Sequence, residues 1–226
     1  MAKRMYFVIS NNLIYEEKTI EFKYFNGFAV SQKQKSIVSL HEAILENDNN
    51  ADILEVSSKS LNEIGTKLSA FNLKIKMNGH LVSLENIFQS SKVFEYGGPY
   101  KDLLNVSPIE AKKDERLRTS GNIVGFELNS KKYPIEPKTL FYDWIYCNTL
   151  NLYPDIVNEI IKYNVFTDIE FNHEKSINCQ ARSVAIFVSL YKQNLLKEAL
   201  SNIDSFLNIV YKQENNGSYK QLSFDF

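Results

Sequence analysis

The chain has 226 residues, of which 44% are hydrophobic and 23% charged, enough to bury the core of one large globular domain. Its 26 basic and 27 acidic side chains leave a net charge near zero, which excludes a general basic surface for nucleic acid and limits DNA binding to a local patch. The two cysteines lack metal-site spacing, and no apolar run reaches the roughly 18 residues that span a bilayer. We therefore expect a cytoplasmic protein with reduced thiols and no membrane contact.

The first third of the chain predicts a mixture of strands and helices. Apolar and polar residues alternate over 20–24, which is typical of a half-buried strand. Apolar residues then recur at helical spacing from Ser31 until the polar run 47–50. A short strand is predicted at 53–56, and a capping box at 60–63 predicts the start of a short helix.

The strongest local signal predicts a hairpin followed by a helix. Asn78-Gly79 lies between the strand-like segments 73–77 and 80–82, and this dipeptide favours a tight turn between antiparallel strands. Ser83 is placed to cap a helix from about Leu84 to Glu95.

The rest of the chain predicts mostly helices. A second capping box, at 107–110, has Pro108 at the first helical position and predicts a charged helix through Arg118. Further helices are predicted at 138–151, 155–163, 179–193 and 195–210.

These elements predict a mainly α fold, that is, an α+β protein with minor β structure. We expect one compact multihelical domain at 66–211 that contains the short β-hairpin. Residues 1–65 are expected to form an N-terminal strand and helix elaboration packed on it, and 212–226 a polar tail.

The predicted helix after Ser83 carries a group of chemically active side chains. Glu85, Gln89 and Lys92 are spaced at i, i+4 and i+7, so they share one face, and Phe88 lies beside them. The pattern alone is also typical of a solvated polar stripe with a weak ion pair. A carboxylate, an amide and an amine facing one place are nevertheless a candidate site.

The same residues resemble a known family. Segments 68–71 and 85–92, followed by the block 107–111, are similar to the NADAR (YbiA-like) pattern, in which a Glu-x-x-Phe-Gln-x-x-Lys helix follows a Ser-x-Phe segment and a hairpin. A narrower set of segments resembles the branch of NADAR antitoxins partnered with DarT-type toxins, which attach ADP-ribose to guanine bases in DNA. These segments are 28–36, 92–100, 166–171 and 176–182.

The resemblance implies an N-glycosidase that removes ADP-ribose from guanine in DNA and so acts as the antitoxin to a DarT-type toxin. Its partners would be ADP-ribosylated DNA and possibly the toxin itself, and neither a cofactor nor a metal is expected. In this family the lysine, matched by Lys92, would form a transient Schiff base with the opened ribose. Glu85 would then transfer protons or anchor ribose hydroxyls.

Other candidate residues lie in the C-terminal half. Asp168 and Glu170 flank Ile169 in a predicted short strand, so both carboxylates face one side. We interpret Asp168 as a third catalytic candidate and Glu170 as a ligand contact, with surface charge as the alternative. Gln180 and Arg182 lie near a predicted helix start, where free N–H groups favour a phosphate, although Arg182 could equally form an internal salt bridge.

Several more residues complete the predicted substrate site. Ser69 and Phe71 are predicted to contact the ribose or stack on a base, with Phe88 and Gln89 beside them. Arg116 and Arg118 belong to a basic run that is either a solvated face or a guide for DNA phosphates.

Two alternative functions remain open from the sequence. The chain could be an N-glycosidase for a small phosphoribosylated metabolite, such as a riboflavin precursor, with little dependence on DNA. It could also be a non-catalytic antitoxin that binds ADP-ribose or the toxin, in which case changing Lys92 would leave neutralisation intact.

Overall fold

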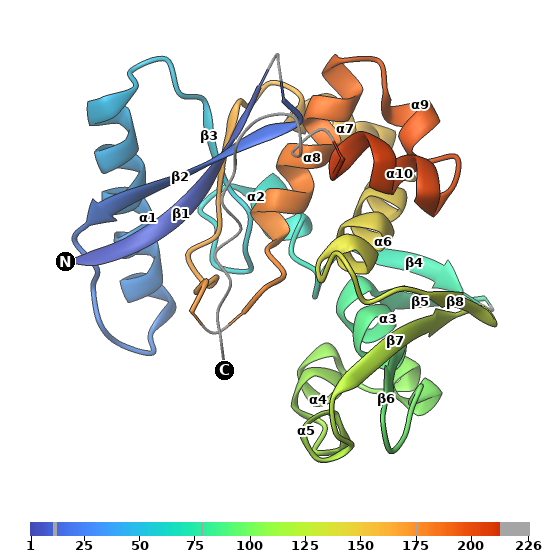
Figure 1. Ribbon diagram of the computed structural model, residues 1–226. Coiled ribbons are helices and arrows are strands. Elements are labelled where there is room, and N and C mark those ends of the chain that lie inside the picture. Colours follow the sequence, from blue (N-terminus) through green and yellow to red (C-terminus); the bar gives the residue numbers. More distant parts are fainter. Residues whose placement is uncertain (11–12, 78, 175, 213–226) are drawn as a thin grey trace.

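The computed structural model describes residues 1–10, 13–77, 79–174 and 176–212 (Figure 1). Helices make up 42% and strands 21% of the described residues, so the α+β class is confirmed, whereas a mainly α fold is not. The difference arises because the strands β6, β7 and β8 lie between residues 92 and 133, where the sequence predicted no strand. No helix in these described segments is long and apolar enough to cross a membrane.

A four-stranded sheet forms the centre of the part that contains the N-terminus. Its order is β2 (Tyr15–Phe22), β1 (Ala2–Ile9), β9 (Val165–Thr167) and β3 (Ile53–Glu55). Strand β1 is antiparallel to both β2 and β9, and β3 is parallel to β9. The N-terminal segment therefore shares its sheet with a strand from much later in the chain.

Helices cover the two faces of this sheet (Figure 1). Side chains alternate between the faces of a strand, so neighbouring residues of β1 enter different cores. Tyr6 packs with the buried residues of α1 (Val30–Asn47), and Phe7 belongs to the larger core around α8 (Gln180–Lys192). The predicted helix after residue 31 is confirmed as α1.

The remaining elements lie mostly on the other side of α8 (Figure 1). The helices are α2 (Glu63–Lys67), α3 (Leu84–Ser90), η1 (Lys101–Asn105), α4 (Pro108–Lys113), α5 (Arg116–Thr119), α6 (Leu140–Leu150), α7 (Pro154–Ile160), α9 (Leu196–Ala199) and α10 (Ile203–Val210). The strands are β4 (Lys74–Met77), β5 (His80–Ser83), β6 (Lys92–Phe94), β7 (Ile123–Leu128) and β8 (Lys131–Tyr133).

The predicted hairpin is confirmed. Strands β4 and β5 are antiparallel, with Met77 opposite His80, and Gly79 has the positive φ of 84° that favours glycine. Asn78 itself lies outside the described residues. Two longer predicted helices are each divided in two: 108–118 forms α4 and α5, and 195–210 forms α9 and α10.

A stack of aromatic rings joins α3 to the third sheet and to α6. The rings of Phe126 and Phe141 are stacked with centroids 4.4 Å apart, and the Phe88 ring lies 5.7 Å from that of Phe126. All three side chains are buried. Aromatic pairs at these separations add stabilisation beyond the area they bury, so the stack holds α3 at a fixed distance from β7.

Candidate active site

Helix α3 forms the rigid wall of the candidate site. Ser83 caps it as predicted, because its hydroxyl accepts a hydrogen bond from the Asn86 N–H at 3.1 Å. The Asn86 amide then donates to the carbonyl oxygens of Leu103 and Val106 at 2.6 and 2.8 Å. All seven residues of the helix are buried, so its polar side chains have little freedom to move.

The predicted extent of this helix was wrong at its C-terminal end. The helix ends at Ser90, and Lys92 is the first residue of β6. The hydroxyl groups of Ser90 and Ser91 both donate to the Ile87 carbonyl, where they compete with the helical N–H bonds. The chain then pairs with β7, where Lys92 lies opposite Phe126.

A cavity of about 850 Å³ lies beside α3. Pockets of roughly 300–1,000 Å³ are typical of ligand sites. The cavity brings together most of the residues predicted from the sequence, although they come from distant segments. Those that line it are Ser69, Phe71, Glu85, Phe88, Gln89, Lys92, Asp168, Glu170 and Gln180.

The Glu85 and Gln89 side chains form a buried pair on α3. The Gln89 Nε2 group donates to the Glu85 Oε1 atom at 2.8 Å. This bond directs the amide nitrogen toward the carboxylate, and the Gln89 Oε1 atom is buried with no partner among the described residues. The Asn178 Oδ1 atom, on another wall of the cavity, is in the same state. Both are acceptors, so a ligand that fits the cavity should present donors to them.

Lys92 is the buried amine of the site, and its surroundings lower its pKa. Its Nζ atom lies 4.7 Å from the centroid of the Phe88 ring. Burial lowers the pKa of Lys92 to about 8, with a further lowering by the charge of Lys112 and an opposing effect from Glu85. An appreciable fraction of Lys92 is therefore neutral near pH 8, as a nucleophilic amine must be.

Lys112, from α4, is a cavity residue that the sequence placed in the basic run with Arg116 and Arg118 but did not assign to the site. Its Nζ atom lies 5.1 Å from the centroid of the Phe71 ring, so two lysine–phenylalanine pairs, Lys92 with Phe88 and Lys112 with Phe71, line one cavity. The side chain of Lys112 is exposed, which leaves its ammonium group able to attract an anion.

Lys112→Ala is expected to raise the pKa of Lys92, because the repulsion between two positive charges is removed. The pH dependence of amine labelling at Lys92, measured by peptide mass spectrometry, should move to higher pH. Lys113→Ala is the matched control, since Lys113 is an exposed lysine of the same helix that does not line the cavity. An identical labelling curve in wild type and Lys112→Ala would show that the charge of Lys112 does not lower the pKa of Lys92.

Asp168 follows strand β9 rather than lying within a strand as predicted. Its Oδ1 atom accepts from the N–H groups of Glu170 and Phe171 at 3.0 and 3.2 Å, and Oδ2 accepts from Gln180 Nε2 at 3.1 Å. Burial, followed by the negative charge of Glu55, raises the pKa of Asp168 to about 7. Asp168 is therefore a carboxyl group that can hold a proton near neutral pH.

Gln180 lies at the start of α8, as predicted, and its side chain holds the Asp168 carboxylate. Its Oε1 atom accepts from the Ala70 N–H at 2.6 Å, while Nε2 also lies 3.3 Å from the Val56 carbonyl. The side chain thus links the start of α8 to the segment before the hairpin and to β3. On the rim, Ser58 Oγ donates to Glu170 at 3.1 Å.

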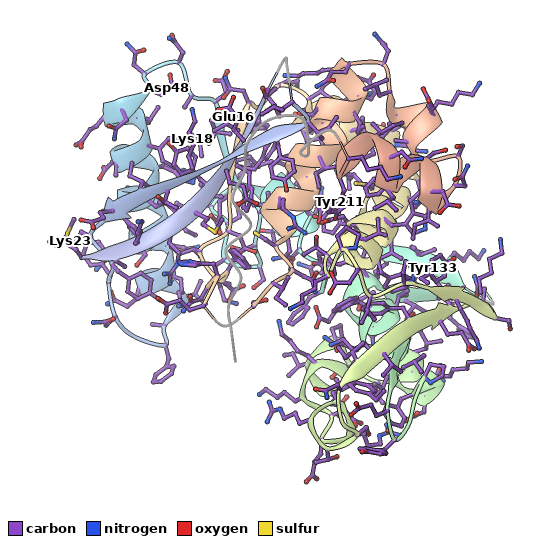
Figure 2. The ribbon with its side chains drawn as sticks, in the orientation of Figure 1. Glu16, Lys18, Lys23, Asp48, Tyr133 and Tyr211 are labelled. Carbon is purple, nitrogen blue, oxygen red and sulfur yellow. The ribbon has the colours of Figure 1, made fainter. Side chains whose placement is uncertain are left out.

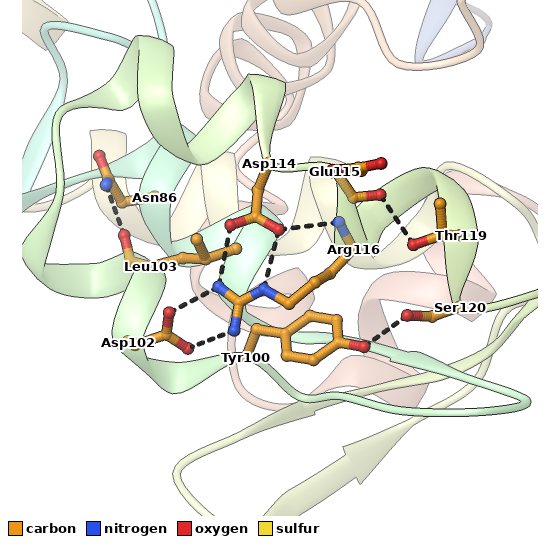
Figure 3. A network of polar contacts seen from close by, with 9 residues as sticks. All are labelled: Asn86, Tyr100, Asp102, Leu103, Asp114, Glu115, Arg116, Thr119 and Ser120. Carbon is orange, nitrogen blue, oxygen red and sulfur yellow. Dashed lines mark hydrogen bonds and ion pairs between the residues drawn. The ribbon is translucent and has the colours of Figure 1, made fainter.

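The three predicted arginines do not line the cavity. Arg118 is exposed. Arg116 is held by Asp114 and Asp102, with Nη2 to oxygen distances of 2.9 and 2.6 Å, and it stacks over Tyr100 (Figure 3). This arrangement fixes the loop between η1 and α5.

Arg182 is buried in an internal ion pair. Its Nη2 group donates to Asp143 Oδ2 at 2.6 Å, and Asp143 also accepts from Ser183 Oγ and from the Tyr211 hydroxyl, each at 2.6 Å. Tyr211 lies directly after α10 (Figure 2). The network therefore joins α6, α8 and α10 below the surface, away from the cavity lining.

Tyr142 is a cavity residue that sequence reasoning missed. Burial, and then the negative charges of Glu85 and Asp168, raise its pKa well above the ordinary value, so it is a neutral phenol near both carboxylates. It stands in an apolar helical run, where its spacing predicts only core packing. Lys59 also lines the cavity, and no motif marks it in the sequence.

The fold and site define an α+β protein with a ligand-sized pocket lined by a lysine of lowered pKa, several carboxylates and aromatic rings. Within that class, the chain belongs to the family of DarT1-associated NADAR antitoxins, whose profile matches residues 2–220. The resemblance seen in the sequence is thereby confirmed. A search of curated proteins found no match.

Proposed function

We propose that the protein is an N-glycosidase that removes ADP-ribose from guanine bases in DNA and so reverses the action of the associated toxin. The observation that carries the proposal is the Lys92 amine, whose pKa is lowered to about 8 by burial and which faces a cavity of about 850 Å³ together with Glu85 and Asp168. A surface lysine with no catalytic role would keep its ordinary charge.

The cavity offers groups for each part of the substrate. Lys59 and Lys112 are cations on its wall that suit a pyrophosphate. The unpaired acceptors of Gln89 and Asn178 suit ribose hydroxyls or the N–H groups of a base. Phe71 provides an aromatic surface for a ring.

The reaction follows from these positions. The neutral Lys92 amine bonds to C1 of the ribose as the bond from C1 to the guanine nitrogen breaks, and the electron pair leaves with the guanine. Asp168 supplies the proton that this nitrogen takes up, and Glu85 receives the proton that Lys92 loses. The nitrogen lone pair then expels the ring oxygen from C1, and this oxygen takes the proton back from Glu85, so the ribose opens and a protonated imine of Lys92 forms. Water adds to C1 of the imine and the Lys92 amine leaves, the remaining proton returns to Asp168, and the freed ADP-ribose closes its ring.

The test is release of ADP-ribose from DNA that carries ADP-ribosylated guanine, followed by gel and mass spectrometry. Wild type should release it, and Glu85→Gln should reduce the rate by about a hundredfold to ten-thousandfold, because a proton-transfer group is lost. Glu115→Gln is the matched control, since Glu115 is exposed and does not line the cavity.

Other outcomes point elsewhere. Release from a small phosphoribosylated metabolite but not from DNA would assign the site to a metabolite. Tight binding of ADP-ribose without turnover would make the protein a non-catalytic antitoxin.

A further inference from the structure

Glu55 is a buried carboxylate of β3 that does not line the cavity and that no sequence motif marks. Its side chain is 2% exposed. Its Oε2 atom accepts from the Thr167 hydroxyl at 2.7 Å, and Oε1 accepts from the Ile169 N–H at 2.8 Å. The two donors lie on either side of Asp168 in the chain. Glu55 therefore fixes, through these two hydrogen bonds, the segment that places Asp168 at the cavity.

A histidine from the N-terminal helix completes this arrangement. His41 Nε2 lies 2.9 Å from the Thr167 Oγ1 atom. Because the Thr167 hydroxyl gives its single hydrogen to Glu55, His41 must donate to Thr167. Burial lowers the pKa of His41 to about 4, so the ring is neutral at pH 7 and serves as a donor without adding charge. Helix α1, strand β3 and strand β9 are thus linked through the side chains of His41, Glu55 and Thr167.

Two buried carboxyl groups this close cannot both ionise at low cost. Burial raises the pKa of Glu55 as well, and each carboxyl group accepts from three donors: Glu55 from the Thr167 hydroxyl, the Ile169 N–H and the side chain of Ser57, and Asp168 from two N–H groups and Gln180. Glu55, however, does not line the cavity. Asp168 faces the cavity, where an acid O–H can meet an acceptor. The proton that the pair shares is therefore better placed on Asp168.

Other titratable groups also face Asp168, but Glu55 is the charged group that raises its pKa most. Tyr142 and Tyr146, both on α6, and Cys179, just before α8, have pKa values raised by burial and stay neutral. Glu170 adds negative charge from the rim and acts in the same direction as Glu55, with a smaller effect.

We propose that Glu55 is a positioning residue which, with Thr167 and His41, keeps a proton on Asp168 so that Asp168 can deliver it to the departing guanine. This role rests on the proposed function in which Asp168 is the acid. It also gives the N-terminal elaboration a part in the chemistry, because both Glu55 and His41 come from the first 65 residues.

The decisive variant is Glu55→Gln, which removes the charge and keeps the shape. It can be accommodated, because the new amide can donate to Thr167, whose hydroxyl can then donate to a His41 ring protonated on Nδ1. With the negative charge gone, Asp168 should ionise at lower pH, by about one unit or more. The carboxyl signal of Asp168, followed by carbon NMR in the free protein and assigned with Asp168→Asn, measures this shift directly.

Catalysis gives a second readout. Only molecules with neutral Lys92 and protonated Asp168 react, so for each unit by which the Asp168 pKa falls, kcat/KM at about pH 8 should fall about tenfold. At about pH 5 it should fall by no more than about twofold for a shift of up to two units, since Asp168 remains largely protonated there. Thr167→Val should shift the profile in the same direction, and Thr167→Ser should restore it. Glu46→Gln, an exposed carboxylate of α1, is the control.

Two results would overturn the role of Glu55. One is an Asp168 titration that does not move in Glu55→Gln, and the other is a rate reduced by the same factor at every pH, as a purely structural defect would produce. The NMR titration needs no substrate. If wild type releases no ADP-ribose, the proposed function fails, but the titration still decides whether Glu55 controls the protonation of Asp168.

Discussion

Lys92→Ala is expected to reduce the release of ADP-ribose by about a thousandfold or more while the protein stays folded, because a reacting amine has no substitute in the cavity. The cavity has two other lysines among the described residues, but Lys112 lies on α4 over the Phe71 ring with its ammonium group exposed, and the Lys59 Nζ group donates to Ser58 Oγ at 2.9 Å. The rates come from single-turnover assays, and a thermal melt checks the fold.

Two further observations make the Lys92 prediction specific. Lys92→Arg keeps a positive charge but remains protonated, so it should be as inactive as the alanine variant. Treatment of the wild-type reaction with a borohydride should leave an ADP-ribose adduct on the peptide that contains Lys92. Full activity in Lys92→Ala, or an adduct on another residue, would remove Lys92 from the chemistry.

Arg182→Met is expected to lower the free energy of unfolding by about 3–5 kcal/mol, because it leaves the Asp143 carboxylate buried without its cation. Asp143 is 0% exposed, and its carboxylate keeps the hydrogen bonds from the Ser183 and Tyr211 hydroxyls but no positive charge beside it among the described residues. Urea unfolding followed by circular dichroism provides the measurement.

The double variant Asp143→Leu with Arg182→Met is the informative control. It removes both charges, so it should be more stable than Arg182→Met alone. Arg116→Met should cost less than about 1 kcal/mol, because the Arg116 pairs are largely exposed to solvent. A stable Arg182→Met protein with weakened ADP-ribose binding would instead make Arg182 a ligand residue.

The parts of the fold that the sequence predicts well are those with local signals. Helix α1, the hairpin and the caps at Ser83 and Ser107 all depend on residues within a few positions of one another. Lys92 shows the limit of such reasoning. Helical spacing predicted that Lys92 lies beside Glu85 and Gln89, and all three do line the cavity. Lys92 nevertheless belongs to strand β6, because the helix has already ended before it.

The polar partners of the site depend on contacts that no local pattern reveals. Thr167 meets Glu55 across 112 residues and His41 across 126. The choice between a phosphate ligand and an internal ion pair for Arg182 depended on Asp143, which lies 39 positions away. The apolar neighbours of Tyr142 in the sequence predict a core residue, although its side chain also lines the cavity.

The position of β9 between β1 and β3 has a consequence for synthesis of the protein on the ribosome. Strands β1 and β3 emerge early, but the strand that separates them begins only at Val165. Until then both expose unpaired edges, which are prone to pair with other chains. Asp168 and Gln180 emerge after β9, so a nascent chain has no completed pocket until most of it has been made. Under the proposed function, protection against the toxin can therefore begin only after Gln180 has left the ribosome.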